Sequence, residues 1–140
     1  MKIVLDTDVI VAAMRSPGGA SAALLMLAHE GTITLLANVP LAIEYEAACS
    51  RAEHQLAAEL TKKEVGQFLD AVVGMMEPVE THFLWRPSLR DPADEMVLEA
   101  AVNGGASAIV TFNQRDYGNV PKNFGLEIVQ PRDILRRIKL

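Results

Sequence analysis

Acidic side chains stand where apolar runs of this sequence end and where helical patterns begin. Asp6 directly follows the apolar run Ile3 to Leu5. Four further acids and one amide are candidates for the same chemistry, namely Asp8, Glu44, Asp94, Asn113 and Asp116. Carboxylates that converge repel one another and are costly to desolvate unless a cation neutralises them. A hard divalent ion such as Mg²⁺ or Mn²⁺ prefers oxygen ligands, so these residues predict a metal site.

The segments that carry these residues predict how they could meet. Residues 2–6 form a short β-branched and leucine run, which is typical of a strand buried on both faces of a parallel sheet. The alternation of strand-like and helical segments predicts an α/β fold with right-handed crossovers and a mainly parallel sheet covered by helices on both faces. Ligands bind beyond the carboxyl ends of the strands in such sheets, where Asp6 is expected. The other predicted strands are residues 32–37, 79–83, 106–112 and 126–129.

The predicted helices carry their own start signals. Asn38 is a candidate cap with Pro40 in the first turn, and Thr61 with Glu64 has the spacing of a capping box. Glu44 is then expected to project from the start of its helix. Besides a helix that follows the first strand, the helical patterns cover residues 18–31, 38–60, 61–76, 91–105 and 131–140.

Most of the acids also have a purely structural interpretation. Asp8 is favoured as the N-cap of the helix after the first strand, and Asp91 as the N-cap of the helix that Pro92 begins. Asp94 could interact only with the dipole of that helix. Asp116 could equally be a turn residue.

Glu44 and Asp6 differ in how easily such an interpretation fits them. Glu44 and Glu46 point about 200° apart on a helix, so both cannot face one site, and Glu44 by itself would be typical of a solvated face. Asp6 is the hardest to explain structurally, since an acid that ends a central strand is expected to be partly buried.

Composition narrows the class of protein. The chain has 140 residues, half of them hydrophobic, so a single domain over residues 1–140 is expected. Thirteen basic and 18 acidic residues give a net charge of -5, which argues against a large non-specific nucleic-acid surface. The single cysteine, Cys49, cannot form an intramolecular bridge, and the three histidines show no zinc spacing. No apolar stretch approaches the ~18 residues of a membrane span, so we expect no membrane partner, no signal peptide and a cytoplasmic location.

Four motifs together resemble the PIN-domain family, the fold of VapC-type toxins of toxin-antitoxin systems. They are "IVLDTDVIVAAM", "LAIEYEAACSR", "RDPADEMVLEAAVNGGASAIVTFNQRDY" and "PRDIL". Within the family the chain is most similar to a subgroup of toxin components with "SPGG" after the first helix, here residues 16–19. The resemblance implies a three-layer α/β/α sandwich with a central, mainly parallel sheet. It also implies a ribonuclease that depends on Mg²⁺ or Mn²⁺.

The resemblance assigns roles to particular residues. It places the family's first three acids on Asp6, Glu44 and Asp94. The fourth position falls on Asn113 or Asp116, and Asn113, being neutral, would weaken a second metal site. Two further positions are supporting ones: Thr111 matches a hydroxyl that lies near the site in the family, and Asp8 stands where many members have Asn.

The resemblance also implies a mechanism and partners. A water activated by the metal would attack an RNA phosphodiester in line. Four arginines are candidates to track the RNA backbone, although each could be an ordinary surface residue: Arg15, Arg51, Arg86 and Arg90. The expected protein partners are a cognate antitoxin and a second copy of the chain. The helix around residues 64–76 is one surface for such contacts, unless its apolar face packs in the core.

Other functions compete with this one. The motif "IVLDTDVIV" also resembles the D-x-D of haloacid-dehalogenase-type phosphatases, with Asp6 as nucleophile and Asp8 as general acid. That chemistry and a receiver-like signalling domain both need a later lysine, and residues 64–121 contain none. A non-catalytic PIN-like binding module is the remaining alternative, against which the intact acids argue.

Overall fold

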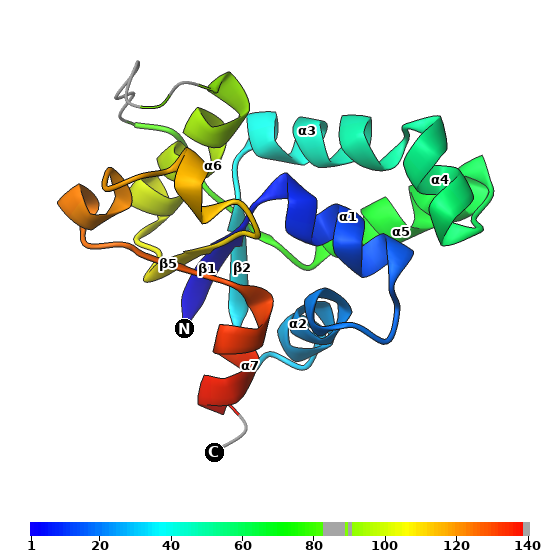
Figure 1. Ribbon diagram of the computed structural model, residues 1–140, viewed down its shortest axis with the longest axis horizontal. Coiled ribbons are helices and arrows are strands. Elements are labelled where there is room, and N and C mark those ends of the chain that lie inside the picture. Colours follow the sequence, from blue (N-terminus) through cyan, green and yellow to red (C-terminus); the bar gives the residue numbers. More distant parts are fainter. Residues whose placement is uncertain (83–88, 90, 139–140) are drawn as a thin grey trace.

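The central element of the fold is a parallel sheet of five short strands. The computed structural model describes residues 1–82, 89 and 91–138 (Figure 1). The strands lie in the order β3-β2-β1-β4-β5, and all four pairings are parallel. This confirms the predicted α/β class. The strands are β1 (Lys2–Leu5), β2 (Thr34–Ala37), β3 (Glu77–Pro78), β4 (Ala108–Val110) and β5 (Glu127–Val129).

Helices cover both faces of this sheet. The chain runs from β1 to β2 to β3 in one direction across the sheet and then returns to β4 on the other side of β1. Because crossovers are right-handed, the helix between β3 and β4, which is α6 (Pro92–Gly104), lies on the opposite face from the helices before it. The helices are α1 (Thr7–Arg15), α2 (Ala20–His29), α3 (Val39–Cys49), α4 (Ala52–Ala58), α5 (Lys62–Gly74), α6 (Pro92–Gly104) and α7 (Pro131–Ile138), with 3₁₀ turns η1 (Gln114–Asp116) and η2 (Pro121–Phe124).

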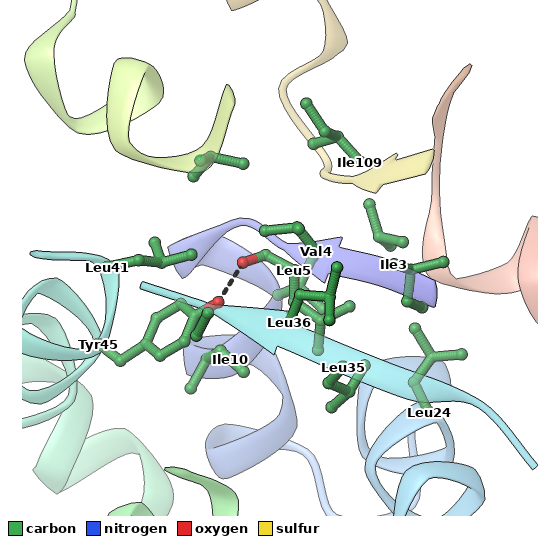
Figure 2. Packing of buried hydrophobic residues seen from close by; sticks show 14 of the residues in the cluster. Ile3, Val4, Leu5, Ile10, Leu24, Leu35, Leu36, Leu41, Tyr45 and Ile109 are labelled. Carbon is green, nitrogen blue, oxygen red and sulfur yellow. Dashed lines mark hydrogen bonds between the residues drawn. The ribbon is translucent and has the colours of Figure 1, made fainter. Parts of the chain in front are cut away.

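The first strand is at the centre of the core, as its sequence predicts. Ile3, Val4 and Leu5 are fully buried, because the strand is covered on both faces and paired on both edges. Figure 2 shows Tyr45 of α3 against the end of this strand, with its hydroxyl directed at the carbonyl of Leu5, to which it donates a hydrogen bond. The last residue of β1 is therefore tied to α3 as well as to its neighbouring strands.

The start of α6 lies next to the start of α3. Asn38 caps α3 by accepting a hydrogen bond from the Leu41 amide at 2.9 Å, as expected, and its amide group donates to the Met96 carbonyl of α6 at 3.2 Å. Two further predicted caps are present: Thr61 and Glu64 form the capping box of α5, and Asp91 caps α6. These local signals set where the helices begin.

Two predicted elements are wrong in detail. The helix expected over residues 38–60 is two helices, because the chain turns at Ser50 and Arg51. Nothing in the helix propensity of this stretch requires a break, but the turn lets Ala58 and Leu60 pack against the core. Packing has therefore overridden local propensity.

The strand expected over residues 79–83 is displaced to Glu77–Pro78. Its partner β2 ends at Ala37, which pairs with Pro78, and the next residue caps α3, so the ladder has no further partner residues. After this pair, the Val79 amide donates to the Ala37 carbonyl at 2.9 Å. Phe83, which ended the prediction, lies outside the described residues.

Other features of the chain agree with its composition. Cys49 is buried, and burial raises the pKa of its thiol to about 11, which makes it a packing residue and a poor nucleophile. Among the residues that the structure describes, no single helix has the length and apolar character to cross a membrane; α1 and α2 pass such a test only as a pair bent by 99°.

Candidate active site

Asp6 joins the end of β1 to the start of α1. Its backbone amide extends the pairing with β4 by donating to the Val110 carbonyl at 2.9 Å. Its carboxylate caps α1 by accepting from the Thr7 amide at 2.7 Å. The side chain is only 8% exposed, so the expectation of a partly buried acid is correct.

Two buried hydroxyl groups hold the second oxygen of this carboxylate. Thr111 Oγ1 donates to Asp6 Oδ2 at 2.8 Å, and the Tyr117 hydroxyl donates to the same atom at 3.1 Å. Both residues are buried. Thr111 was predicted to lie near the site, whereas Tyr117 was not, because a tyrosine in "RDYG" carries no local signal of its partner 111 residues away. The Asp6 carboxylate is thus fixed by donors at both oxygens.

Asp8 does not cap α1, contrary to the prediction. Because Asp6 takes that position, Asp8 lies in the first turn, where its Oδ2 accepts from the Phe112 amide at 3.0 Å and the Asn113 side-chain amide at 3.1 Å. Its other oxygen, Oδ1, is buried and has no hydrogen-bond partner among the described residues. Burial first, and the Asp6 charge second, raise the pKa of Asp8 from 3.8 to about 6. Asp8 therefore ties the segment after β4 to α1.

Asp94 brings a second buried carboxylate to the same edge of the sheet. It lies in the first turn of α6 and is 7% exposed, so it is not a solvated partner of the helix dipole. Burial raises its pKa from 3.8 to about 7, and the nearby charges of Asp6, Asp91, Asp116 and Asp8 contribute in that order. Asp94 and Asp116 also line one pocket, so acids of α6 and η1 meet there.

The two candidates for the fourth acid position differ in where they face. Asp116 lies at the end of η1 and, with Asp94 and Tyr117, lines a pocket of about 330 Å³. Its charge also contributes to the raised pKa of Asp6, whose main cause is burial. Asn113 instead directs its amide at Asp8 and lines a neighbouring pocket. Asp116 is the one that shares a pocket with Asp94.

Glu44 stands apart from this group in the described structure. The prediction placed Glu44 at the start of its helix, but it is the sixth residue of α3. Its side chain is partly exposed. It is not among the charges that raise the pKa of Asp6, Asp8 or Asp94. Its neighbour Tyr45 contacts the end of β1, which places Glu44 on the helix that borders the site.

Two of the four predicted RNA-contacting arginines belong to the described residues, and neither lines the acidic pocket. Arg15 is exposed at the end of α1, with Nη1 3.4 Å from His54 Nδ1, and Arg51 is exposed before α4. Arg86 and Arg90 lie outside the described residues. The sequence did not single out Arg115, yet this exposed residue of η1 lines the pocket that contains Asp94 and Asp116.

The donor set fits a hard divalent cation in its chemistry. The group offers the carboxylate oxygens of the buried acids Asp6 and Asp94, whose pKa values are raised, and the Oδ1 atom of Asp8, which has no hydrogen-bond partner among the described residues. A cation would offset the charge repulsion that adds to the effect of burial on these pKa values. However, among the described residues no three acidic, histidine or cysteine side chains are close enough together to hold a metal ion. The residues therefore fit the ion by the chemistry of their oxygen donors alone.

Comparisons with known proteins show which family the chain belongs to. The sequence profile of the PIN domain matches residues 2–115. None of the curated proteins matches the chain. Among solved structures, a chain of VapBC2 from Rickettsia felis, bound to a DNA fragment from their promoter, has the same fold with a TM-score of 0.62. The alignment covers 91% of this chain and 97% of that one at 16% identity. The profile spans most of the chain and the fold agrees with it, so this protein belongs to the PIN-domain family.

Proposed function

We propose that this protein is a metal-dependent ribonuclease and the toxin of a toxin-antitoxin pair. The observation that supports this most strongly is the meeting of Asp6, Asp94 and Asp116 at the carboxyl end of a parallel sheet, two of them beside one pocket. Membership of the PIN-domain family supports the same function. It disfavours the phosphatase and receiver alternatives, which belong to other families.

The metal ligands in this proposal are Asp6, Asp94 and Asp116, with Glu44 contributing from α3. Asp116 is preferred to Asn113 as the fourth ligand, because it is charged and shares the pocket with Asp94. The ion would be Mg²⁺ or Mn²⁺, the cations that prefer oxygen ligands and keep several waters. When bound, it supplies the positive charge that favours attack of water on a phosphodiester.

The residues around these acids have positioning roles. Thr111 and Tyr117 donate to one oxygen of Asp6 and so fix the plane of its carboxylate. Asp8 holds Phe112 and Asn113, and with them the start of the segment that leads to Asp116. Such second-layer contacts typically change metal affinity or activity by about 10–100-fold when they are removed.

The proposed partners are an RNA substrate, a cognate antitoxin and a second copy of this chain, and the proposed location is the cytoplasm. The likeness to a chain of VapBC2 supports a toxin-antitoxin assignment. The sequence suggested helix α5 as a contact surface. Three of its apolar residues are buried in the core, namely Val65, Leu69 and Val72. Its half-exposed Val73 and the exposed Ile43 of α3 line an open pocket of about 480 Å³, which is the remaining candidate surface. Light scattering of the purified chain would measure the dimer.

The first experiment is cleavage of a mixed single-stranded RNA pool with Mg²⁺ or Mn²⁺. Wild type should cleave it, while Asp6→Asn and Asp94→Asn should each lose more than about 100-fold, beyond the range of positioning contacts. Asp70→Asn, which removes an exposed carboxylate on α5, is the matched control and should be as active as wild type.

A thermal shift with the same metals accompanies this assay. A site that binds the ion in the folded state alone raises the melting temperature, and the two site variants should lose that rise. Wild type that neither cleaves RNA nor gains stability from metal would refute the nuclease proposal and favour a binding module. Release of phosphate from small esters would instead point to a phosphatase.

A further inference from the structure

Phe112 is an exposed aromatic residue next to the acidic site. Its side chain is 45% exposed, and of the aromatic side chains that the structure describes it is the only exposed one. Single exposed apolar residues are common and need no function. Phe112, however, is held in place, because its backbone amide donates to Asp8 and the preceding Thr111 amide donates to the Val129 carbonyl at 2.9 Å. The ring is therefore presented from a fixed backbone.

A polar pocket of about 330 Å³ adjoins this ring. It is lined by Phe112, by three side-chain amides and by two charged residues of η1; the other members are Asn113, Gln114, Arg115, Asp116 and Gln130. Gln130 directly follows β5 and its backbone amide donates to Asp133 at 2.8 Å, so both walls come from strand ends at one edge of the sheet. An aromatic face together with amides that donate and accept is the combination that binds an unpaired nucleobase.

Arg115 and Asp116 connect this pocket to the acidic one. Both residues line both pockets, because η1 runs between them. An arginine at this boundary can pair with the phosphate that joins two nucleotides, and it offsets the charge of Asp116 beside it. A chain of RNA could then run from the acidic pocket across Arg115 to Phe112.

We propose that the pocket beside Phe112 binds one unpaired RNA base, stacked on the phenyl ring, while Arg115 binds the adjoining phosphate. This inference rests on the proposed nuclease function and names the residues that bind the base and the phosphate beside the acidic pocket. The side-chain amides of Gln114 and Gln130 contact the edge of the base. A duplex presents no free base face, so it binds more weakly than the same strand alone.

The test measures equilibrium binding of a short fluorescent single-stranded RNA to the full chain. Anisotropy is recorded with Ca²⁺ in place of Mg²⁺, and the RNA is checked for integrity afterwards. Phe112→Ala and Phe112→Leu should each weaken binding about tenfold, since stacking on an aromatic ring is lost in both, while Phe112→Tyr should bind like wild type. Leu56→Ala, at another exposed apolar residue on α4, should change nothing.

Arg115→Gln tests the phosphate contact through its salt dependence. Loss of one phosphate contact should reduce the slope of log affinity against log salt by about 0.7. An unchanged slope would remove Arg115 from the proposal.

Other outcomes separate this inference from the nuclease proposal. Wild-type affinity in Phe112→Ala, full affinity in Phe112→Leu, or equal binding of duplex and single strand would overturn the base pocket, as would no RNA binding by wild type. Binding that depends on an aromatic residue, from a protein that cleaves no RNA with Mg²⁺ or Mn²⁺, would uphold the base pocket and refute the nuclease.

Discussion

The two buried aspartates of the candidate site are held in opposite ways. Asp6, at the end of β1, receives hydrogen bonds from the Thr7 amide and from two hydroxyl groups. Asp94, at the start of α6, is buried near other acids. Among the described residues no hydrogen-bond donor reaches its carboxylate. The pKa of Asp94 accordingly rises to about 7, whereas the donors at Asp6 counter part of the effect of burial on its pKa.

This difference separates two contributions to the site. The β1 and β4 side is organised by hydrogen bonds, so its geometry is present before any ligand arrives. The α6 side has an electrostatic imbalance that a cation would relieve. Removing Asp6 should therefore lower the free energy of unfolding, whereas removing the charge of Asp94 should raise it.

The largest expected effect on stability is that of Asp6→Ala. The substitution removes the cap of α1 and leaves the buried hydroxyls of Thr111 and Tyr117 without their acceptor, so the free energy of unfolding should fall by about 2–4 kcal/mol. Urea unfolding at neutral pH measures this. Asp70→Ala, at an exposed position, should stay within about 0.5 kcal/mol of wild type; a similar value for Asp6→Ala would contradict the comparison.

The second effect is a loss of stability of the metal-free protein at high pH. In the folded protein the pKa of Asp94 is about 7 and that of Asp8 is about 6, whereas both are near 3.8 in the unfolded chain. The free energy of unfolding should therefore be highest near pH 4 and fall as the pH rises through 7, because the folded state binds more protons in that range. Asp94→Asn should flatten the fall near pH 7 and be more stable than wild type at pH 8.

Added Mg²⁺ or Mn²⁺ should oppose that fall in wild type, since ionised carboxylates bind the ion and protonated ones do not. Unfolding at a series of pH values, with and without metal, gives both results. Wild-type stability that does not change from about pH 5 to pH 8 without metal would show that the pKa of Asp94 is not raised in the folded protein.

A smaller effect is expected at Asp8, where two substitutions should differ. Asp8→Ala leaves the amides of Phe112 and Asn113 without their acceptor and should cost about 1–2 kcal/mol, whereas Asp8→Asn keeps an acceptor and removes a charge near Asp6. Hydrogen exchange of the Phe112 amide should be faster in the alanine variant alone. Equal exchange in both variants would mean that Asp8 does not hold this segment.

The smallest change is expected for Tyr117→Phe, which removes one of three donors to Asp6 and keeps the ring. Stability should fall by about 1 kcal/mol, and the pKa of Asp6 should rise further because a donor that favours its ionised form is lost. Titration followed by carbonyl NMR of Asp6 would detect the rise. An unchanged Asp6 pKa would show that the hydroxyl does not orient this carboxylate.

Local features of the fold could be predicted because they depend on near neighbours. The caps at Asn38, Thr61 and Asp91 each involve partners two or three residues away, so the spacing of residue types is enough to find them. The apolar run of β1 likewise predicts a buried central strand from its composition alone. The alternation of such segments was sufficient for the α/β class and for placing Asp6 at the edge of the sheet.

Contacts between distant segments set the role of each acid. Asp6 and Asp8 are both good caps by type, and the choice between them depends on Thr111 and Phe112, more than 100 residues further along the chain. Tyr117 reaches Asp6 across 111 residues, and no local pattern marks that contact. The helix starts and the buried strand can be recognised from neighbouring residue types, since these features follow from short-range hydrogen bonds and hydrophobicity. The strand order and the grouping of the acids were decided by long-range packing, because they join segments that only the folded chain brings together.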